Sequence, residues 1–157
     1  MRFETKLLYV ALTLAFCLWP ASLSPPETMD LVHQAWHASW IRHPEGPRRE
    51  FGVFHFRKNF TLDSAPQRFV IRVSGDNRYE LFVNGRRVLA GPARGDLSNW
   101  RYETLDIAPY LAAGRNVLAA VVWNFSALAP AAQISNEAGL IVQGDTPAEE
   151  VVNTDET

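Results

Sequence analysis

The chain has 157 residues, of which 47% are hydrophobic and 20% are charged, and its formal net charge at pH 7 is −2. This length suffices for about one ordinary domain with its own apolar core. A charge this close to balance favours neither a nucleic acid nor an anionic membrane surface as the partner.

The first residues have the three parts of a secretory signal peptide. Arg2 and Lys6 flank an apolar run at 7–18, and small residues follow Pro20. The run is shorter than the roughly 20 residues of a membrane span, and a buried helix is the alternative interpretation. We therefore expect residues 1–24 to be a signal peptide. The mature protein would then be secreted or periplasmic, with no membrane segment left.

The basic residues and the single cysteine are unevenly placed. Cys17 lies within the expected signal peptide, so the mature chain would have no disulfide and no thiolate ligand or nucleophile. Lipidation at Cys17 is an alternative that the bulky Phe16 before it disfavours. Every basic residue after residue 24 lies between Arg42 and Arg115, and all but Lys58 are arginine. Codon usage would explain this bias, and so would a need for flat, forked donors that suit hydroxyl pairs and carboxylates.

After an irregular lead-in, the chain alternates between apolar and polar residues as strands do. This pattern predicts strands at 51–62, 68–73, 79–83, 100–107, 117–125 and 139–142. Asn84-Gly85 predicts a tight hairpin turn, because both central positions of a type I′ turn need positive φ. The chain would return from it through Val88 and Leu89. Gly75-Asp76-Asn77 is expected to end the second strand, and no convincing amphipathic helix is present.

Short strands at near-regular spacing, separated by turn residues, predict an all-β, antiparallel β-sandwich. We assign residues 25–145 to this domain. The acidic tail at 146–157 has few large apolar residues and is expected to be a truncated linker.

Most known catalytic motifs are missing from the sequence. It has no GxSxG, no HExxH and no glycine-rich phosphate loop. His33 and His37 have the i, i+4 spacing of metal ligands, but histidines satisfied by other partners are more usual. Asp76 and Asp96 could form the acid and base of a glycosidase, yet carboxylates at strand ends more often cap turns. We expect no enzymatic activity from this chain by itself.

Two places carry candidate ligand-binding residues. Asp76 and Asn77 offer adjacent oxygens beside a glycine, which fits either part of a calcium site or an Asx-turn that ends the strand. The loop after the hairpin holds Arg94, Asp96 and Trp100, a planar cation, a carboxylate and an indole that together suit a polyhydroxylated ligand. We predict that these three residues bind carbohydrate together with Asn77.

Other aromatic residues are expected in the core. They are Trp40, Tyr79 and Tyr110.

At these residues the chain resembles the N-terminal β-sandwich region of bacterial α-L-rhamnosidases. The resemblance rests on motifs that follow one another in a single order from about 35 to 145. They are Trp40-Ile41 with Pro44, Val53-Phe54-His55-Phe56-Arg57-Lys58, Gly75-Asp76-Asn77-Arg78-Tyr79, Val83-Asn84-Gly85, Gly91-Pro92-Ala93-Arg94-Gly95-Asp96, Trp100-Arg101-Tyr102-Glu103-Thr104, Gly114-Arg115-Asn116-Val117-Leu118, Val122-Trp123-Asn124-Phe125, Ala132-Gln133-Ile134-Ser135 and Gln143-Gly144-Asp145.

The resemblance implies a galactose-binding-domain-like jelly roll that binds rhamnose or related sugars, sometimes with calcium. In full-length relatives a catalytic barrel follows for several hundred residues, so the activity belongs to them and not to this polypeptide. The chain would be a fragment or a free-standing module. Two functions stay open: a carbohydrate-binding accessory domain that takes a rhamnose-containing glycan, and a purely structural module that supports a catalytic barrel.

Overall fold

The computed structural model describes residues 35–130 and 135–155, and the strands within these ranges are joined by loops and single 3-10 turns. The expected signal peptide at 1–24, His33 and residues 131–134 lie outside them. No helix in the described ranges has the length and hydropathy needed to cross a bilayer. The strands are β1 (Gly52–Leu62), β2 (Val70–Asp76), β3 (Arg78–Val83), β4 (Arg86–Gly91), β5 (Glu103–Asp106), β6 (Gly114–Asn124) and β7 (Gly139–Gly144).

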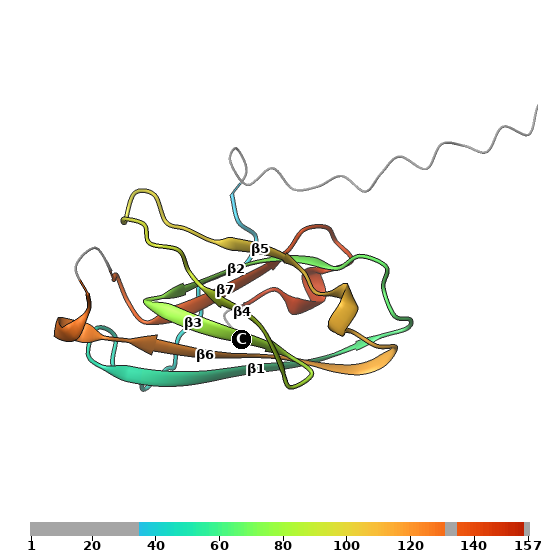
Figure 1. Ribbon diagram of the computed structural model, residues 1–157, viewed down its shortest axis with the longest axis horizontal. Coiled ribbons are helices and arrows are strands. Elements are labelled where there is room, and N and C mark those ends of the chain that lie inside the picture. The colour runs from blue at the N-terminus through green and yellow to red at the C-terminus, as the bar shows by residue number, and fades with distance from the viewer. Residues whose placement is uncertain (1–34, 131–134, 156–157) are drawn as a thin grey trace, which may run out of the picture.

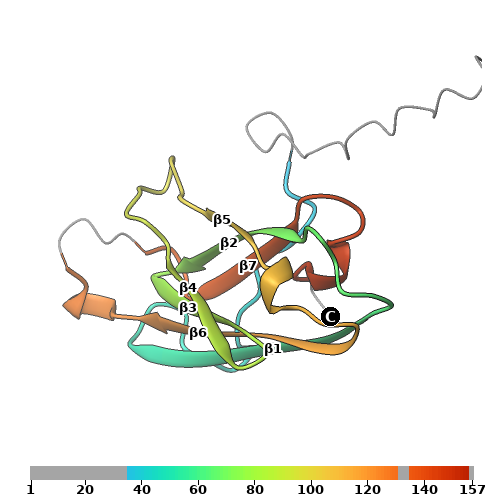
Figure 2. The same ribbon diagram turned by 45° about the vertical axis from the view of Figure 1, so that its right-hand side comes forward.

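The strands form two antiparallel sheets, which confirms the predicted β-sandwich. One sheet has the order β1-β6-β3-β4 and the other has the order β5-β2-β7. Figure 1 shows them as two layers, with β5, β2 and β7 above β3, β6 and β1. The two layers are also separate in the rotated view of Figure 2.

The core lies between the layers because alternate residues of each strand point inward. In β3, Tyr79, Leu81 and Val83 are fully buried while the residues between them are half-buried. Ile71 of β2 and Val122 of β6 are equally inaccessible from the two opposing sheets. Tyr79 belongs to this core, as predicted, and Tyr110 is partly buried and packs against it.

The Asn84-Gly85 hairpin is also confirmed. Both residues have positive φ, 49° and 81°, and they join Val83 directly to Arg86. The Asn84 side chain fixes this turn to the rest of the fold, because its Oδ1 accepts from the Val117 amide at 2.9 Å. Its Nδ2 donates to Asn116 Oδ1 at 2.9 Å.

Several strand limits differ from those predicted, among them the start of β6 at Gly114 instead of 117 and the end of β7 at Gly144 instead of 142. β2 runs on through Gly75 and Asp76, which pair with β7 instead of ending the strand. A Cβ on Gly75 would lie 3.0 Å from the Tyr79 ring, so this glycine is a site of close packing and not a break. β5 covers only Glu103–Asp106 of the predicted 100–107, because its ladder with β2 stops at Val73.

The segment 145–155, which includes most of the predicted linker at 146–157, packs on the sandwich. Val152, in a 3-10 turn at Glu150–Val152, is 1% exposed and belongs to the core cluster. The Thr154 amide donates to Val142 O at 3.0 Å, and the Ser39 amide donates to Thr154 O at 2.9 Å. Figure 2 shows the lead-in in cyan close to this red C-terminal segment.

This packing has a physical reason. The acidic residues of the segment meet two arginines that are distant in sequence, Arg68 just before β2 and Arg72 within it. Asp145 is 2% exposed and pairs with Arg68 and with Arg72, the latter at 2.6 Å.

Candidate functional site

Four aromatic side chains line a cleft on the side of the three-stranded sheet. Trp36 and Trp40 come from the lead-in, and Trp100 and Tyr102 come from the loop between β4 and β5. We call this space the aromatic cleft. It has a volume of about 920 Å³, within the range of small-ligand pockets.

The rings of the aromatic cleft pack edge to face across the two segments. Trp36 and Tyr102 have centroids 5.4 Å apart, and Trp40 and Trp100 have centroids 5.8 Å apart at an interplanar angle of 90°. Such pairs are favourable because the positive edge of one ring meets the negative face of the other. Trp40 remains 46% exposed and Tyr102 38% exposed, so ring surface stays available to a ligand.

A short relay of hydrogen bonds orients Trp100. Its indole Nε1 donates to Ser74 Oγ at 2.9 Å, and Ser74 Oγ donates to the Arg101 carbonyl at 2.6 Å. Ser74 is buried in β2. The rigid strand therefore fixes the half-buried indole at the edge of the aromatic cleft.

The predicted residues Arg94 and Asp96 lie on the same loop, outside the lining of the aromatic cleft. Arg94 is exposed. The exposed Asp96 accepts from the Ser98 and Asn99 amides, both at 2.8 Å, and from the Asn99 side chain. These bonds, with the Asn99 side chain first, lower the pKa of Asp96. The carboxylate thus shapes the turn that presents Leu97 and Trp100 to the cleft.

Asp76 lies in the lining of the aromatic cleft, and its carboxylate anchors a neighbouring loop. It accepts from Ser135 Oγ at 2.6 Å, from the Asn136 amide at 2.5 Å and from the Glu137 amide at 2.8 Å. Burial raises the pKa of Asp76, although these hydrogen bonds oppose the shift. Asn136 and Glu137 are thereby placed on the wall of the cleft.

Asn77, the second predicted calcium ligand, is 1% exposed, and its Oδ1 accepts from the Phe125 amide at 2.8 Å. Within 35–130 and 135–155, no cluster of three or more His, Cys, Asp or Glu side chains is arranged to hold a metal ion. Calcium at Asp76 and Asn77 stays a prediction.

The placement of Trp40 in the core was wrong, and sequence reasoning also missed Trp36 and Tyr102. Trp40 is exposed because Ile41, its neighbour, turns inward and forms a β-bridge with Leu140. Strand alternation predicts Trp40 outside and Ile41 inside only once the lead-in is recognised as pairing with β7. The sequence gives no direct sign of that pairing. The tryptophan spacing in an otherwise polar lead-in was the available signal.

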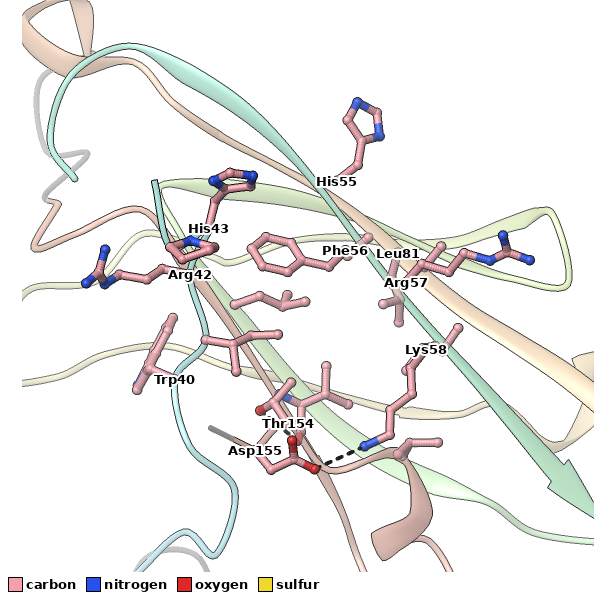
Figure 3. Close-up of a pocket in the computed structure, with 18 residues that line it drawn as sticks. Trp40, Arg42, His43, His55, Phe56, Arg57, Lys58, Leu81, Thr154 and Asp155 are labelled. Carbon is pink, nitrogen blue, oxygen red and sulfur yellow. Dashed lines mark hydrogen bonds and ion pairs between the residues drawn. The ribbon is translucent and has the colours of Figure 1, made fainter. Parts of the chain in front are cut away.

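A second hollow opens between the two sheets, beside β1. Figure 3 shows Arg42 and His43 on one side of it, Phe56 and Lys58 of β1 on the other, and Thr154 and Asp155 at its lower end. Its volume is about 1080 Å³, and buried residues of both sheets, including Leu81 and Val142, line it. We call it the edge groove.

Several solved structures have a fold similar to that of this chain. A rhamnosidase of family GH78 from Bacillus sp. GL1 is 28% identical over 78% of this chain, with a TM-score of 0.68. The α-L-rhamnosidases of Dictyoglumus thermophilum and Streptomyces avermitilis give TM-scores of 0.58 and 0.54 at 20% and 23% identity, over 77% and 72% of this chain. No protein-family model matches the chain, and no curated protein sequence matches it significantly.

The chain has the fold of an α-L-rhamnosidase domain. This confirms the resemblance inferred from the sequence motifs. The chain covers only 13%, 16% and 11% of the three rhamnosidase chains, so it corresponds to a small part of each. The coarser part of the functional prediction, an accessory domain of a rhamnosidase-like protein, is therefore supported.

Proposed function

We propose that the chain is a carbohydrate-binding accessory domain of an α-L-rhamnosidase-like glycoside hydrolase, and that the aromatic cleft takes the sugar. The observation that carries this proposal is the gathering of four aromatic rings from two separate segments, with ring surface left exposed. A pyranose ring has an apolar face that stacks on an indole and a rim of hydroxyls that needs polar partners. Arg42, Asn136 and Glu137 supply polar groups in the same cleft.

The predicted sugar-binding residues take different parts in this proposal. Trp100 is the stacking platform, and Asp96 acts through the shape of its turn. Arg94, exposed on the same loop, meets the parts of a longer glycan that extend beyond the cleft. Asn77 acts indirectly, because its side chain is buried and accepts a hydrogen bond from the Phe125 amide.

The proposed ligand is a rhamnose-containing glycan. One similar structure, that of Streptomyces avermitilis, is described as complexed with L-rhamnose. We also propose that calcium assists through Asp76 and Asn77, that the protein is secreted or periplasmic, and that full-length relatives supply a catalytic barrel as the partner. Stacking contributions of about 0.5–2 kcal/mol per contact point to affinities of about millimolar to micromolar.

Calorimetric titration of the chain with L-rhamnose and rhamnosylated oligosaccharides tests the proposal, with calcium and with a chelator. Saturable binding is expected, and Trp100→Ala should weaken it by about tenfold or more. Trp123→Ala is the matched control, because this half-buried indole lies on β6 in the other sheet. Absence of binding under both conditions, or equal losses in the two variants, would remove the proposed sugar site.

A second candidate function, inter-domain support without a ligand, is favoured by the outer face of β6. Val117, Val121 and Trp123 point outward there and are only half-buried, and Val53 beside Trp123 is 52% exposed. An apolar outer face on a sheet is typical of a surface that another domain covers.

Adding the chain in trans to a Bacillus sp. GL1 rhamnosidase that lacks the matched region tests this second function. If the chain supports the catalytic domain, rhamnosidase activity should return when the chain is added. The Val121→Glu variant should not restore activity, whereas Trp100→Ala should restore it. The support function would be excluded if activity were the same with and without the added chain, or if Val121→Glu restored activity as well as the parent chain.

A further inference from the structure

β1 is a long edge strand. Among the described strands it pairs only with β6, over its whole length from Gly52 to Leu62. The backbone donors and acceptors on the other side of an edge strand are a template for a further strand. The edge groove lies on this side of β1 (Figure 3).

Inward side chains of β1 are less covered than those of its neighbours. Phe56 is half-buried, whereas Ala120 and Leu81, which follow it across the sheet on β6 and β3, are buried. The edge groove thus exposes the border of the apolar core between the sheets. Side chains that alternate along an incoming strand would reach this border at every second residue.

The rim of the edge groove is mainly positive. Arg42 on the lead-in and Arg57 on β1 are exposed on it. Lys58 donates to the Asn153 carbonyl at 2.7 Å and lies 3.5 Å from Asp155. One carboxylate therefore faces three cations. An inward-facing lysine on an edge strand also disfavours pairing with a wholly apolar strand.

We propose that the edge groove binds an extended, acidic peptide segment of another protein, which adds a strand to β1 and inserts alternate apolar side chains between the sheets. Main-chain bonds to β1 supply affinity in this mode, and the groove with its basic rim supplies selectivity. This inference goes beyond the proposed sugar binding. The edge groove is a second hollow that shares Trp40, Ile41 and Arg42 with the aromatic cleft and otherwise has its own lining.

A peptide of about eight residues, a usual strand length, in which valine alternates with glutamate, is the probe. Titration of the full chain should show saturable binding that weakens as salt is added. Replacing the glutamates by lysine, or the valines by serine, should each weaken binding by about tenfold or more. The Arg42→Glu, Arg57→Glu double variant should do the same. The Arg86→Glu, Arg115→Glu double variant, which alters exposed arginines outside the groove, should bind as the parent does.

Hydrogen exchange locates the bound peptide. Amides of β1 should exchange more slowly in its presence, while those of β4 (Arg86–Gly91), the opposite edge of the same sheet, should not change. The proposal is overturned if the valine–glutamate peptide does not bind, if the serine or lysine peptide binds equally well, or if protection appears on β4 and not on β1. Trp100→Ala should leave peptide binding intact, which separates this result from the sugar titration.

Discussion

Asn116 shows how one polar side chain can fix several loops. It is fully buried, and its Oδ1 accepts from Asn84 Nδ2 at 2.9 Å and from the Ala112 amide at 3.0 Å. Its Nδ2 donates to the Ala112 and Gly114 carbonyls. The hairpin turn and the 111–114 corner are thus joined through one amide. Buried polar groups are tolerated when their hydrogen bonds are satisfied in this way.

Asn116→Ala is expected to lower the free energy of unfolding by about 2 kcal/mol, because the four hydrogen bonds of this fully buried amide would be lost. Urea unfolding measures this. Asn59→Ala, an exposed asparagine on β1, is the control and should change stability by less than about 0.5 kcal/mol. Equal effects would show that the buried network contributes little.

At the scale of elements, the C-terminal segment depends on charge pairs with β2. Burial by itself would raise the pKa of Asp145, but hydrogen bonds from Arg68 and Arg72 outweigh it and the pKa is lowered. Glu149, also buried, accepts from the Thr146 amide at 2.8 Å and closes the turn that follows Asp145. The segment is therefore fastened to the sheet at its beginning, and Val152 and Thr154 hold its end.

Asp145→Asn should destabilise the fold at pH 7 by about 2 kcal/mol, less than for a fully buried pair because Arg68 is partly exposed. The folded-state pKa lies below the ordinary aspartate value of about 3.9, so the carboxylate stabilises the fold above that value. This stabilisation is lost as the pH falls through the folded-state pKa. Unfolding followed from pH 7 to pH 3 should show the two proteins converging.

Asp155→Asn is the control for this experiment. Asp155 is more than half exposed and lies 3.5 Å from Lys58, an exposed pair of small effect. Its unfolding curves should follow those of the parent across the pH range. A constant gap between parent and Asp145→Asn at every pH would contradict the assigned role of the Asp145 carboxylate.

At the scale of the whole molecule, the two sheets share one core. Buried residues from both sheets, from the 107–111 corner and from Val152 form a single cluster. The aromatic cleft depends on this arrangement, because its rings come from the lead-in and the β4–β5 loop and rest on β2 and β7. One cooperative unit of this size is expected to unfold in one step.

Leu81→Ala should cost about 3 kcal/mol, since Leu81 is fully buried between the sheets. Leu128→Ala, at a site that is 83% exposed, should cost less than about 0.5 kcal/mol. Tryptophan fluorescence and far-ultraviolet circular dichroism should give the same midpoint for each protein. Separate midpoints would indicate that the layers unfold independently.

The sequence by itself determined the strands, the Asn84-Gly85 turn and the two-layer architecture. These follow from alternation and positive φ, which are local properties of the chain. It also singled out Trp100 as a candidate binding residue. Only the tertiary structure decided that Trp36, Trp40 and Tyr102 join Trp100 in one cleft and that the acidic tail packs on β2. Those contacts connect residues far apart in the chain, and no local periodicity encodes them.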